Sequence, residues 1–133
     1  MRGGTEILVQ SRRVYDVIPS GPSYVVLIDR LWPRGIKKES IRIDMWAKEL
    51  APSDNLRKWF NHDPEKWIDF RELYKKELCD SKKIEIIESI RMHKNITLLY
   101  ASKETVYNNA EAFREILEHF DEFRNYCLDS RTV

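Results

Sequence analysis

Cysteine and glycine are scarce in this sequence, and each shortage argues against particular kinds of binding site. Cys79 and Cys127 stand alone among 133 residues, without a CxxC pair or the spacing of metal ligands. Isolated cysteines are typical of reduced thiols in the cytoplasm, so we expect free thiols rather than a disulfide. Hyperthermophiles are the exception, because their intracellular proteins often contain disulfides. The four glycines form neither GxGxxG nor a P-loop, which disfavours a Rossmann dinucleotide site and a Walker-type NTPase.

Long apolar runs and an excess of one charge are also missing. No stretch reaches the about 18 consecutive apolar residues that span a bilayer, and residues 1–6 lack the apolar core of a signal peptide. The 23 basic and 22 acidic residues leave a net charge of +1, which gives no general attraction for nucleic acid or an anionic membrane. The three histidines are scattered, so no metal and no cofactor is indicated. We predict a cytoplasmic protein without membrane contact, whose anion binding is local.

The length and a hydrophobic content of 42% suit a single domain over residues 1–133. Unbroken apolar runs predict buried strands near residues 24–29 and 96–101. A third strand is expected near 12–17, and residues 7–10 form either an edge strand or part of one bent strand with it. Two apolar strands joined by a long helical crossover are most simply parallel. We therefore predict a compact α/β domain with a small, mainly parallel sheet flanked by helices.

Helical signals begin after residue 40. Residues 43–50 can form a short helix that buries Trp46 and Leu50. Further helices are expected to start at polar residues of the type and spacing of N-caps, namely Ser53, Asp63 (followed by Pro64), Ser81 and Asn108. The last of these helices carries an apolar face from Phe113 to Phe120, and an earlier start at Ser102 stays open.

The stretch IDRLWPRGI, residues 28–36, follows a buried strand at once. In open α/β sheets, ligands bind beyond the carboxyl ends of the strands. If the two buried strands are parallel, polar side chains after Ile28 and after Ala101 reach the same edge, and a helix start at Asn108 and Asn109 adds N–H groups that favour anions. Arginine forks and a lysine point charge suit phosphate or carboxylate. The predicted ligand-binding residues are Arg30, Trp32, Arg34, Lys103 and Asn109.

Each of these residues also has a structural interpretation. The two arginines can pair with nearby carboxylates or a helix C-terminus, and Trp32 can belong to the core. Asn108 suits a helix cap better than a ligand contact. Trp46, Trp59 and Trp67 lie at helical spacings, which favours core packing.

His62 lies in a loop before a capped helix, where an imidazole titrates near neutrality and suits acid–base chemistry. His62 and Glu104 are therefore the candidate catalytic residues. The alternative for His62 is a surface or loop-fixing role. No Ser-His-Asp or Cys-His arrangement follows from the spacing.

These residues together resemble the YeaO-like family, catalogued as domain of unknown function 488. The similarity covers residues 12–118, and its most specific block is Asp29–Gly35. Its other segments are Val14–Asp16, Trp46–Pro52, Leu56–Phe60, His62–Pro64, Trp67, Phe70, Tyr74, Glu77–Leu78, Thr97–Ala101, Lys103 and Asn108–Ala110.

The resemblance implies a small cytoplasmic α/β protein with no established activity, so it carries no catalytic assignment. The family's characteristic positions include six candidates named above: Arg30, Trp32, Arg34, His62, Lys103 and Asn109. The chain departs from the family pattern in two places. Ser102-Lys103-Glu104 stands where Ala-Lys-Asp is usual, and Tyr107 stands where a histidine usually precedes the two asparagines. If that histidine were a catalytic base, this chain would lack it.

Three functions compete. The first is a binding protein or enzyme for a small phosphate- or carboxylate-bearing ligand, nucleotides included. If the protein is an enzyme, a transferase or hydrolase is favoured over an oxidoreductase, because no cofactor motif is present. Trp32 or Tyr107 would then stack on the ligand. The second is a nucleic-acid-binding accessory protein, since residues 30–48 hold six basic side chains interleaved with Trp32 and Trp46. The third is a protein-interaction module without a ligand site. The oligomeric state stays open.

Overall fold

The computed structural model describes residues 6–16 and 21–132, with side chains up to residue 129. The strands are β1 (Leu8–Arg13), β2 (Tyr24–Leu27), β3 (Met45–Trp46) and β4 (Asn95–Tyr100). The helices are α1 (Asp54–Phe60), α2 (Trp67–Glu77), α3 (Ser81–Arg91), α4 (Asn109–Glu118) and α5 (Phe120–Thr132). Short 3₁₀ turns lie at Lys38–Ser40, Lys48–Leu50 and Pro64–Lys66.

The four strands form one sheet in the order β1-β4-β2-β3, and every neighbouring pair is parallel. The predicted α/β fold with a parallel sheet is therefore confirmed. Residues 8–13 form one continuous strand at the edge, so the segment 7–10 is not a separate strand. The strand predicted near 12–17 is therefore wrong in its bounds: residues 14–16 form a turn and a bend, and residue 17 lies outside the described residues.

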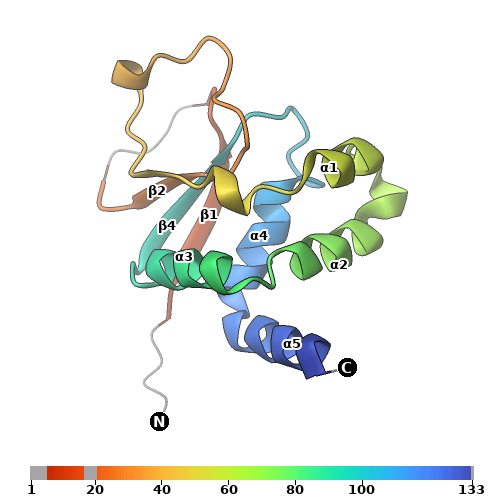
Figure 1. Cartoon of the computed structure of the whole chain (residues 1–133). Helices are drawn as coiled ribbons and strands as arrows, with labels where there is room; N and C mark the ends of the chain where they lie inside the picture. The colour runs from red at the N-terminus through yellow and green to blue at the C-terminus, as the bar shows by residue number, and fades with distance from the viewer. Residues whose placement is uncertain (1–5, 17–20, 133) are drawn as a thin grey trace.

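The two faces of the sheet are covered by different material (Figure 1). On one face, apolar residues of β1, β2 and β4 pack against helical residues such as Phe70, Ile87 and Phe113. On the other face, Val25, Leu27 and Leu99 pack against side chains of the long segment between β2 and β3, namely Trp32, Ile36, Ile41 and Ile43, and against Trp46 of β3. β2 is apolar on both faces because this loop takes the place of a second helical layer.

Three of the predicted helix starts, at Ser53, Asp63 and Asn108, are confirmed as N-caps. Ser53 Oγ accepts the N–H of Leu56, and the Asn108 side chain accepts the N–H of Glu111 at 2.9 Å. Asp63 caps the Pro64–Lys66 turn that continues into α2. α3 begins at Ser81 as predicted, with the Asp80 side chain as its cap. These caps satisfy N–H groups that the first turn of a helix leaves without a backbone partner.

The helix expected over residues 43–50 is wrong. Met45 and Trp46 form strand β3 beside β2, and a 3₁₀ turn at Lys48–Leu50 follows. Asp44 fixes this arrangement because its carboxylate accepts the N–H of Val25 at 2.8 Å. Trp46 adds a second link through its indole N–H, which donates to the Asp29 carbonyl at 2.8 Å. Pairing with a neighbouring strand has therefore overridden a helical spacing of apolar residues.

The final helix is divided in two. α4 ends at Glu118, His119 leaves the helical conformation, and α5 begins at Phe120. Phe120, Phe123 and Cys127 of α5 are buried in the same core as α4.

The expectation of free thiols is also wrong. Cys79, just after α2, and Cys127 in α5 form a disulfide, with their Cα atoms 5.3 Å apart. The packing of α5 brings together two cysteines that are 48 positions apart in the sequence, which spacing alone does not reveal. The cytoplasmic prediction thereby loses the support that it took from reduced cysteines. Within the described ranges, no helix is long and apolar enough to cross a membrane.

Candidate functional site

The carboxyl ends of β2 and β4 meet at one edge of the sheet, as predicted. The two strands are neighbours and parallel, and the N–H of Ile28 donates to the Leu99 carbonyl at 3.1 Å. Just beyond, the N–H of Ala101 donates to the Asp29 carboxylate at 2.8 Å. The polar segments that follow the two strands therefore begin side by side.

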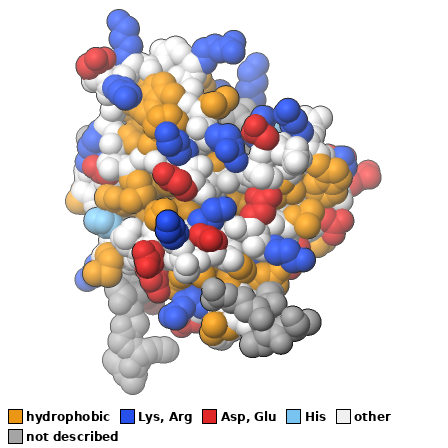
Figure 2. Space-filling view, viewed as in Figure 1, with side chains coloured by type: hydrophobic (Ala, Val, Ile, Leu, Met, Phe, Trp, Pro, Cys, Tyr) orange, Lys and Arg blue, Asp and Glu red, His pale blue; other side chains and the backbone are white. Residues whose placement is uncertain are grey.

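A pocket of about 540 Å³ lies at this edge. Its walls come from the segment after β2, from α1 and the loop that follows it, from the start of the loop after β4 and from the first turn of α4. Its polar lining comprises Asp29, Arg30, Arg34, Asp54, Arg57, Lys58, Asn61, His62, Ser102 and Asn109. Four of these side chains are positive at neutral pH and two are carboxylates. Figure 2 shows lysine and arginine side chains gathered over the upper part of the molecule, where Figure 1 places the loop after β2.

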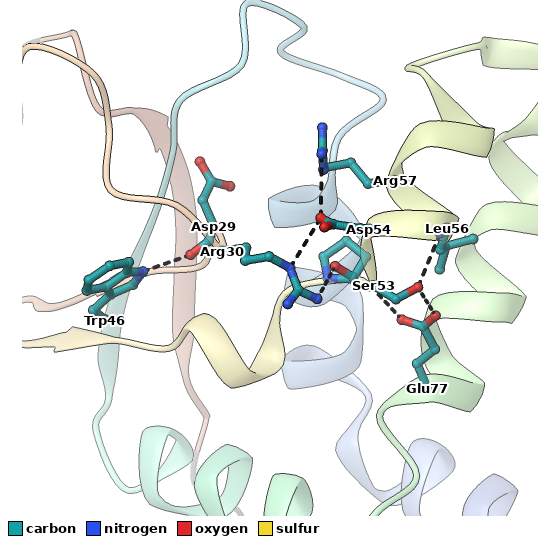
Figure 3. Close-up of polar contacts among 9 residues, drawn as sticks. Asp29, Arg30, Trp46, Ser53, Asp54, Leu56, Arg57 and Glu77 are labelled. Atoms are coloured by element: carbon teal, nitrogen blue, oxygen red, sulfur yellow. Dashed lines mark hydrogen bonds and ion pairs between the residues drawn. The ribbon is translucent and has the colours of Figure 1, made fainter.

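Arg30 is held mainly by internal partners (Figure 3). Its Nη2 donates to the Pro52 carbonyl at 3.2 Å, and its Nε lies 3.5 Å from the Asp54 carboxylate. Asp54 also pairs with Arg57 at 3.5 Å. These side chains are about half exposed, and ion pairs of that kind contribute about 0–1 kcal/mol. Arg30 therefore connects the segment after β2 to the start of α1.

Arg34 stands in a different environment. Its backbone carbonyl accepts the Tyr15 hydroxyl at 2.8 Å, and Gly35 follows with a φ of +81°, a left-handed conformation that favours glycine. The side chain is exposed at the pocket, and no residue in the described part of the chain hydrogen-bonds or ion-pairs with its guanidinium. The turn thus fixes the backbone of Arg34 and leaves its charge available.

Trp32 lines the pocket but belongs to the loop-side core. Its indole N–H donates to the Ile36 carbonyl at 2.6 Å, and its ring meets Trp46 edge-on at 5.4 Å. Lys38 lies over the same ring, 5.8 Å from its centre. Tyr107, the other predicted stacking residue, packs edge-on against Trp67 and is absent from the described lining of the pocket.

Asn109 and Asp29 form a hydrogen-bonded pair at the floor of the site. The Asn109 amide donates to the Ile28 carbonyl at 2.9 Å and to the Asp29 carboxylate at 3.1 Å. Burial raises the pKa of Asp29, and the hydrogen bonds from Asn109 and Ala101, followed by the charges of His62 and Arg57, oppose that rise without cancelling it. Asn109 therefore ties α4 to the end of β2 and fixes the Asp29 side chain.

His62 is placed by a strained turn after α1. Asn61 and His62 have φ values of 46° and 55°, a left-handed conformation that is uncommon outside glycine. The His62 Nδ1 lies 2.9 Å from the Tyr107 carbonyl. A carbonyl can only accept, so Nδ1 carries the hydrogen and Nε2 is left for another partner. His62 lines the pocket and could exchange a proton or donate to an anion there.

Lys103 and Glu104 lie outside the described lining of the pocket. Glu104 instead closes its own loop, because its carboxylate accepts the N–H groups of Val106 and Tyr107 at 3.0 and 3.1 Å. The bonds from Tyr107 and Val106 lower the pKa of Glu104. The structure therefore brings together Arg30, Trp32, Arg34, His62 and Asn109 and leaves Lys103 and Glu104 apart from them.

The comparisons with known proteins agree with the resemblance seen in the sequence. A family model described as "Inactive DUF488-N3 subclade" matches residues 8–129. The chain belongs to the DUF488 family. The uncharacterised protein YeaO of Escherichia coli K12 is 41% identical over 103 residues, which are 77% of this chain and 90% of YeaO. The uncharacterised proteins Rv3073c of Mycobacterium tuberculosis H37Rv and Mb3100c of Mycobacterium bovis are 33% identical over 112 residues, 84% of this chain and 95% of each relative. No solved structure matches at a significant level.

In this DUF488 chain, the sequence interpretation missed the side chains that α1 contributes to the site. Asp54, Arg57 and Lys58 of α1 reach the pocket because α1 packs beside the carboxyl ends of the strands. Their signal in the sequence is an ordinary polar helix face. The motif Leu56–Phe60, part of the family resemblance, could have drawn attention to Arg57 and Lys58, whereas Asp54 lies outside it.

Proposed function

We propose that this DUF488 protein binds a small phosphate- or carboxylate-bearing molecule in the pocket at the carboxyl ends of β2 and β4. The observation that supports it most is the charge of the lining, with four cationic side chains against two carboxylates in about 540 Å³. Pockets of a few hundred Å³ are the usual size for small-molecule sites. Arg34 is the central anion ligand of the proposal, because its guanidinium meets no internal partner among the described residues.

Binding without catalysis is the form of the proposal that the observations favour. The family model that matches the chain is described as inactive. Tyr107 stands where the family pattern usually has a histidine, and Glu104 lies away from the pocket. His62 then acts as a binding residue that donates a hydrogen bond to the anion through Nε2 when it is protonated. A transferase or hydrolase reaction is the alternative, and turnover of the bound ligand would support it.

The test is a binding screen on the wild-type protein with inorganic phosphate, pyrophosphate, small carboxylates and nucleoside monophosphates. We expect at least one of them to raise the melting temperature, since a ligand at about 100 times its Kd stabilises the folded state by about 2.7 kcal/mol. Arg34→Ala should abolish the shift and keep the melting temperature of the free protein. Lys37→Ala is the matched control, because Lys37 is an exposed cation of the same loop that does not line the pocket. Equal effects of the two variants would contradict the assignment to Arg34.

Nucleic-acid binding by the basic segment 30–48 is the second candidate, and one feature counts against it. Lys48 lies over the Trp46 ring at 4.8 Å from its centre, as Lys38 does over Trp32, so the two tryptophans are engaged within the chain. Affinity for single-stranded DNA or RNA that falls steeply with salt would favour this candidate. A chain that binds none of these molecules would fit the interaction module.

A further inference from the structure

Asp29 is a carboxylate of the pocket that has no positive partner in direct contact among the residues that the structure describes. Its Oδ2 accepts the Ala101 N–H, and its Oδ1 accepts the Asn109 amide, both neutral donors. Within the described residues, no lysine, arginine or histidine nitrogen lies within 4.0 Å of its carboxylate oxygens. Figure 3 shows the Asp29 carboxylate pointing away from the side chain of Arg30.

Asp54, the other carboxylate of the pocket, has the opposite environment. It is exposed and lies 3.5 Å from both Arg30 and Arg57. Among the described residues, the pocket thus contains one carboxylate in direct contact with cations and another, Asp29, on which His62 and Arg57 act only from beyond 4.0 Å. An ionised carboxylate has about four acceptor positions, and neutral donors occupy two of them at Asp29. The two remaining positions have no donor among the described residues, and Asp29 lines the pocket.

Burying an ionised carboxylate away from water is unfavourable unless donors or a cation surround it. The same burial raises the pKa of Asp29. A bound group with N–H donors would remove this penalty, because N–H groups supply the hydrogens that the two remaining acceptor positions need. An anion alone would not, since it would bring a second negative charge close to Asp29.

We propose that the ligand of this pocket carries an N–H donor group as well as its anionic group, and that Asp29 accepts the N–H hydrogens while Arg34 binds the anion. This inference rests on the proposed anion-binding function and adds the class of ligand to it. Two kinds of molecule share this chemistry: a nucleotide whose base presents N–H groups, of which guanine is the richest, and a phosphorylated amine. Asp29 is then the residue that determines specificity.

Calorimetric titration with matched phosphate pairs tests the inference. Guanosine and inosine monophosphate differ at C2, where guanine has an amino donor and hypoxanthine only a hydrogen atom. Phosphoethanolamine and ethyl phosphate differ by one ammonium group. We expect the donor-bearing member of one pair to bind wild-type protein at least about tenfold more tightly, since hydrogen bonds to charged groups are strong. The pair that shows the preference identifies the source of the N–H group.

Asp29→Asn supplies the decisive variant. With the guanine pair the preference for guanosine monophosphate should fall, because a neutral amide accepts the hydrogens of the amino group more weakly than an ionised carboxylate does. With the amine pair the affinity for phosphoethanolamine should fall to that for ethyl phosphate. Asp54→Asn is the control: it releases Arg30 and Arg57, so it should strengthen all phosphates alike and keep the preference of the wild type.

The outcomes separate the two proposals. Equal affinity of the wild type for both members of each pair overturns the role of Asp29 and leaves anion binding standing. An equal loss of affinity for all probes in a folded Asp29→Asn protein shows a structural role and overturns the inference. If Asp29→Asn does not fold, the wild-type preference within the pairs decides. Absence of binding by every phosphate probe overturns the proposed function and this inference with it.

Discussion

Asp29 and Asp54 belong to the same pocket, and their surroundings give them different properties. Asp54 is exposed and lies between two arginines, whereas Asp29 is half-buried and held by Ala101 and Asn109. At the scale of the residue, what matters is therefore the position of each carboxylate relative to solvent and to charge. Because Asp29 is half-buried, its ionisation should change the stability of the protein even without a ligand.

The stability of the protein should depend on pH through Asp29. Its pKa is raised in the folded chain, so the folded state holds this proton to a higher pH than the unfolded state does. Stability therefore falls as pH rises from the ordinary aspartate value, about 4, through the raised folded value. We expect the free energy of unfolding of the wild type, relative to Asp29→Asn, to decrease over this window and to level off above it. Urea denaturation of both proteins at a series of pH values measures the difference; an increase with pH would contradict the prediction.

At the scale of the element, helix α1 is fixed to α2 through its N-cap. The Ser53 hydroxyl donates to the Glu77 carboxylate at 2.6 Å and also accepts the N–H of Leu56. The backbone N–H of Ser53 donates to the same carboxylate at 2.9 Å. Because Asp54 and Arg57 follow directly, this contact between the start of α1 and the end of α2 also positions two side chains of the pocket.

Ser53→Ala should lower the free energy of unfolding by about 1–2 kcal/mol, since an N-cap of this kind typically contributes about 1 kcal/mol and Glu77 loses a donor as well. Urea denaturation monitored by circular dichroism gives the value. Ser89→Ala is the matched control, because Ser89 is an exposed serine within α3 whose hydroxyl, among the described residues, donates to the Ile86 carbonyl of its own helix and caps no helix start. A loss no larger than that of the control would show that the cap is not needed.

At the scale of the whole molecule, the disulfide joins the end of α2 to the last helix. Cys127 and Phe123 of α5 are buried, and Cys79 lies beside the same core. The bond closes a loop that contains α3, β4 and α4, so it restricts most of the second half of the chain in the unfolded state. Neither cysteine lines the pocket, so the main effect of the bond is expected on stability.

Reduction of the disulfide should lower the free energy of unfolding by about 2–4 kcal/mol, because a closed loop of this length restricts the unfolded chain. Denaturation with and without reductant measures the difference. The double variant Cys79→Ser with Cys127→Ser should show the same loss and no further response to reductant. Two titratable thiols in the unreduced, denatured protein would contradict the bond itself.

Local signals account for what the sequence interpretation predicted well. Ser53, Asp63 and Asn108 cap helices through contacts two or three residues away, so their type and spacing are sufficient evidence. The apolar runs of β2 and β4 likewise predicted buried parallel strands. Two other predictions failed because their outcome depends on distant partners. β3 exists through its pairing with β2, and the disulfide exists because α5 returns to the end of α2.

The candidate site also contains some features that local sequence signals predict and others that depend on contacts between distant segments. Arg30, Arg34 and Asn109 could be placed at one edge, because strand direction and the position of a residue after its strand fix that edge. The contribution of α1, and the exclusion of Lys103 and Glu104, depend on how helices and loops pack around it. The sequence by itself determined the buried strands β2 and β4, three helix caps, the sheet edge and the family, since these follow from neighbours along the chain. Only the tertiary structure decided which arginine keeps its guanidinium without a partner, and which aspartate has no cation in contact, among the described residues, because partners for those charges come from segments that are distant in the sequence.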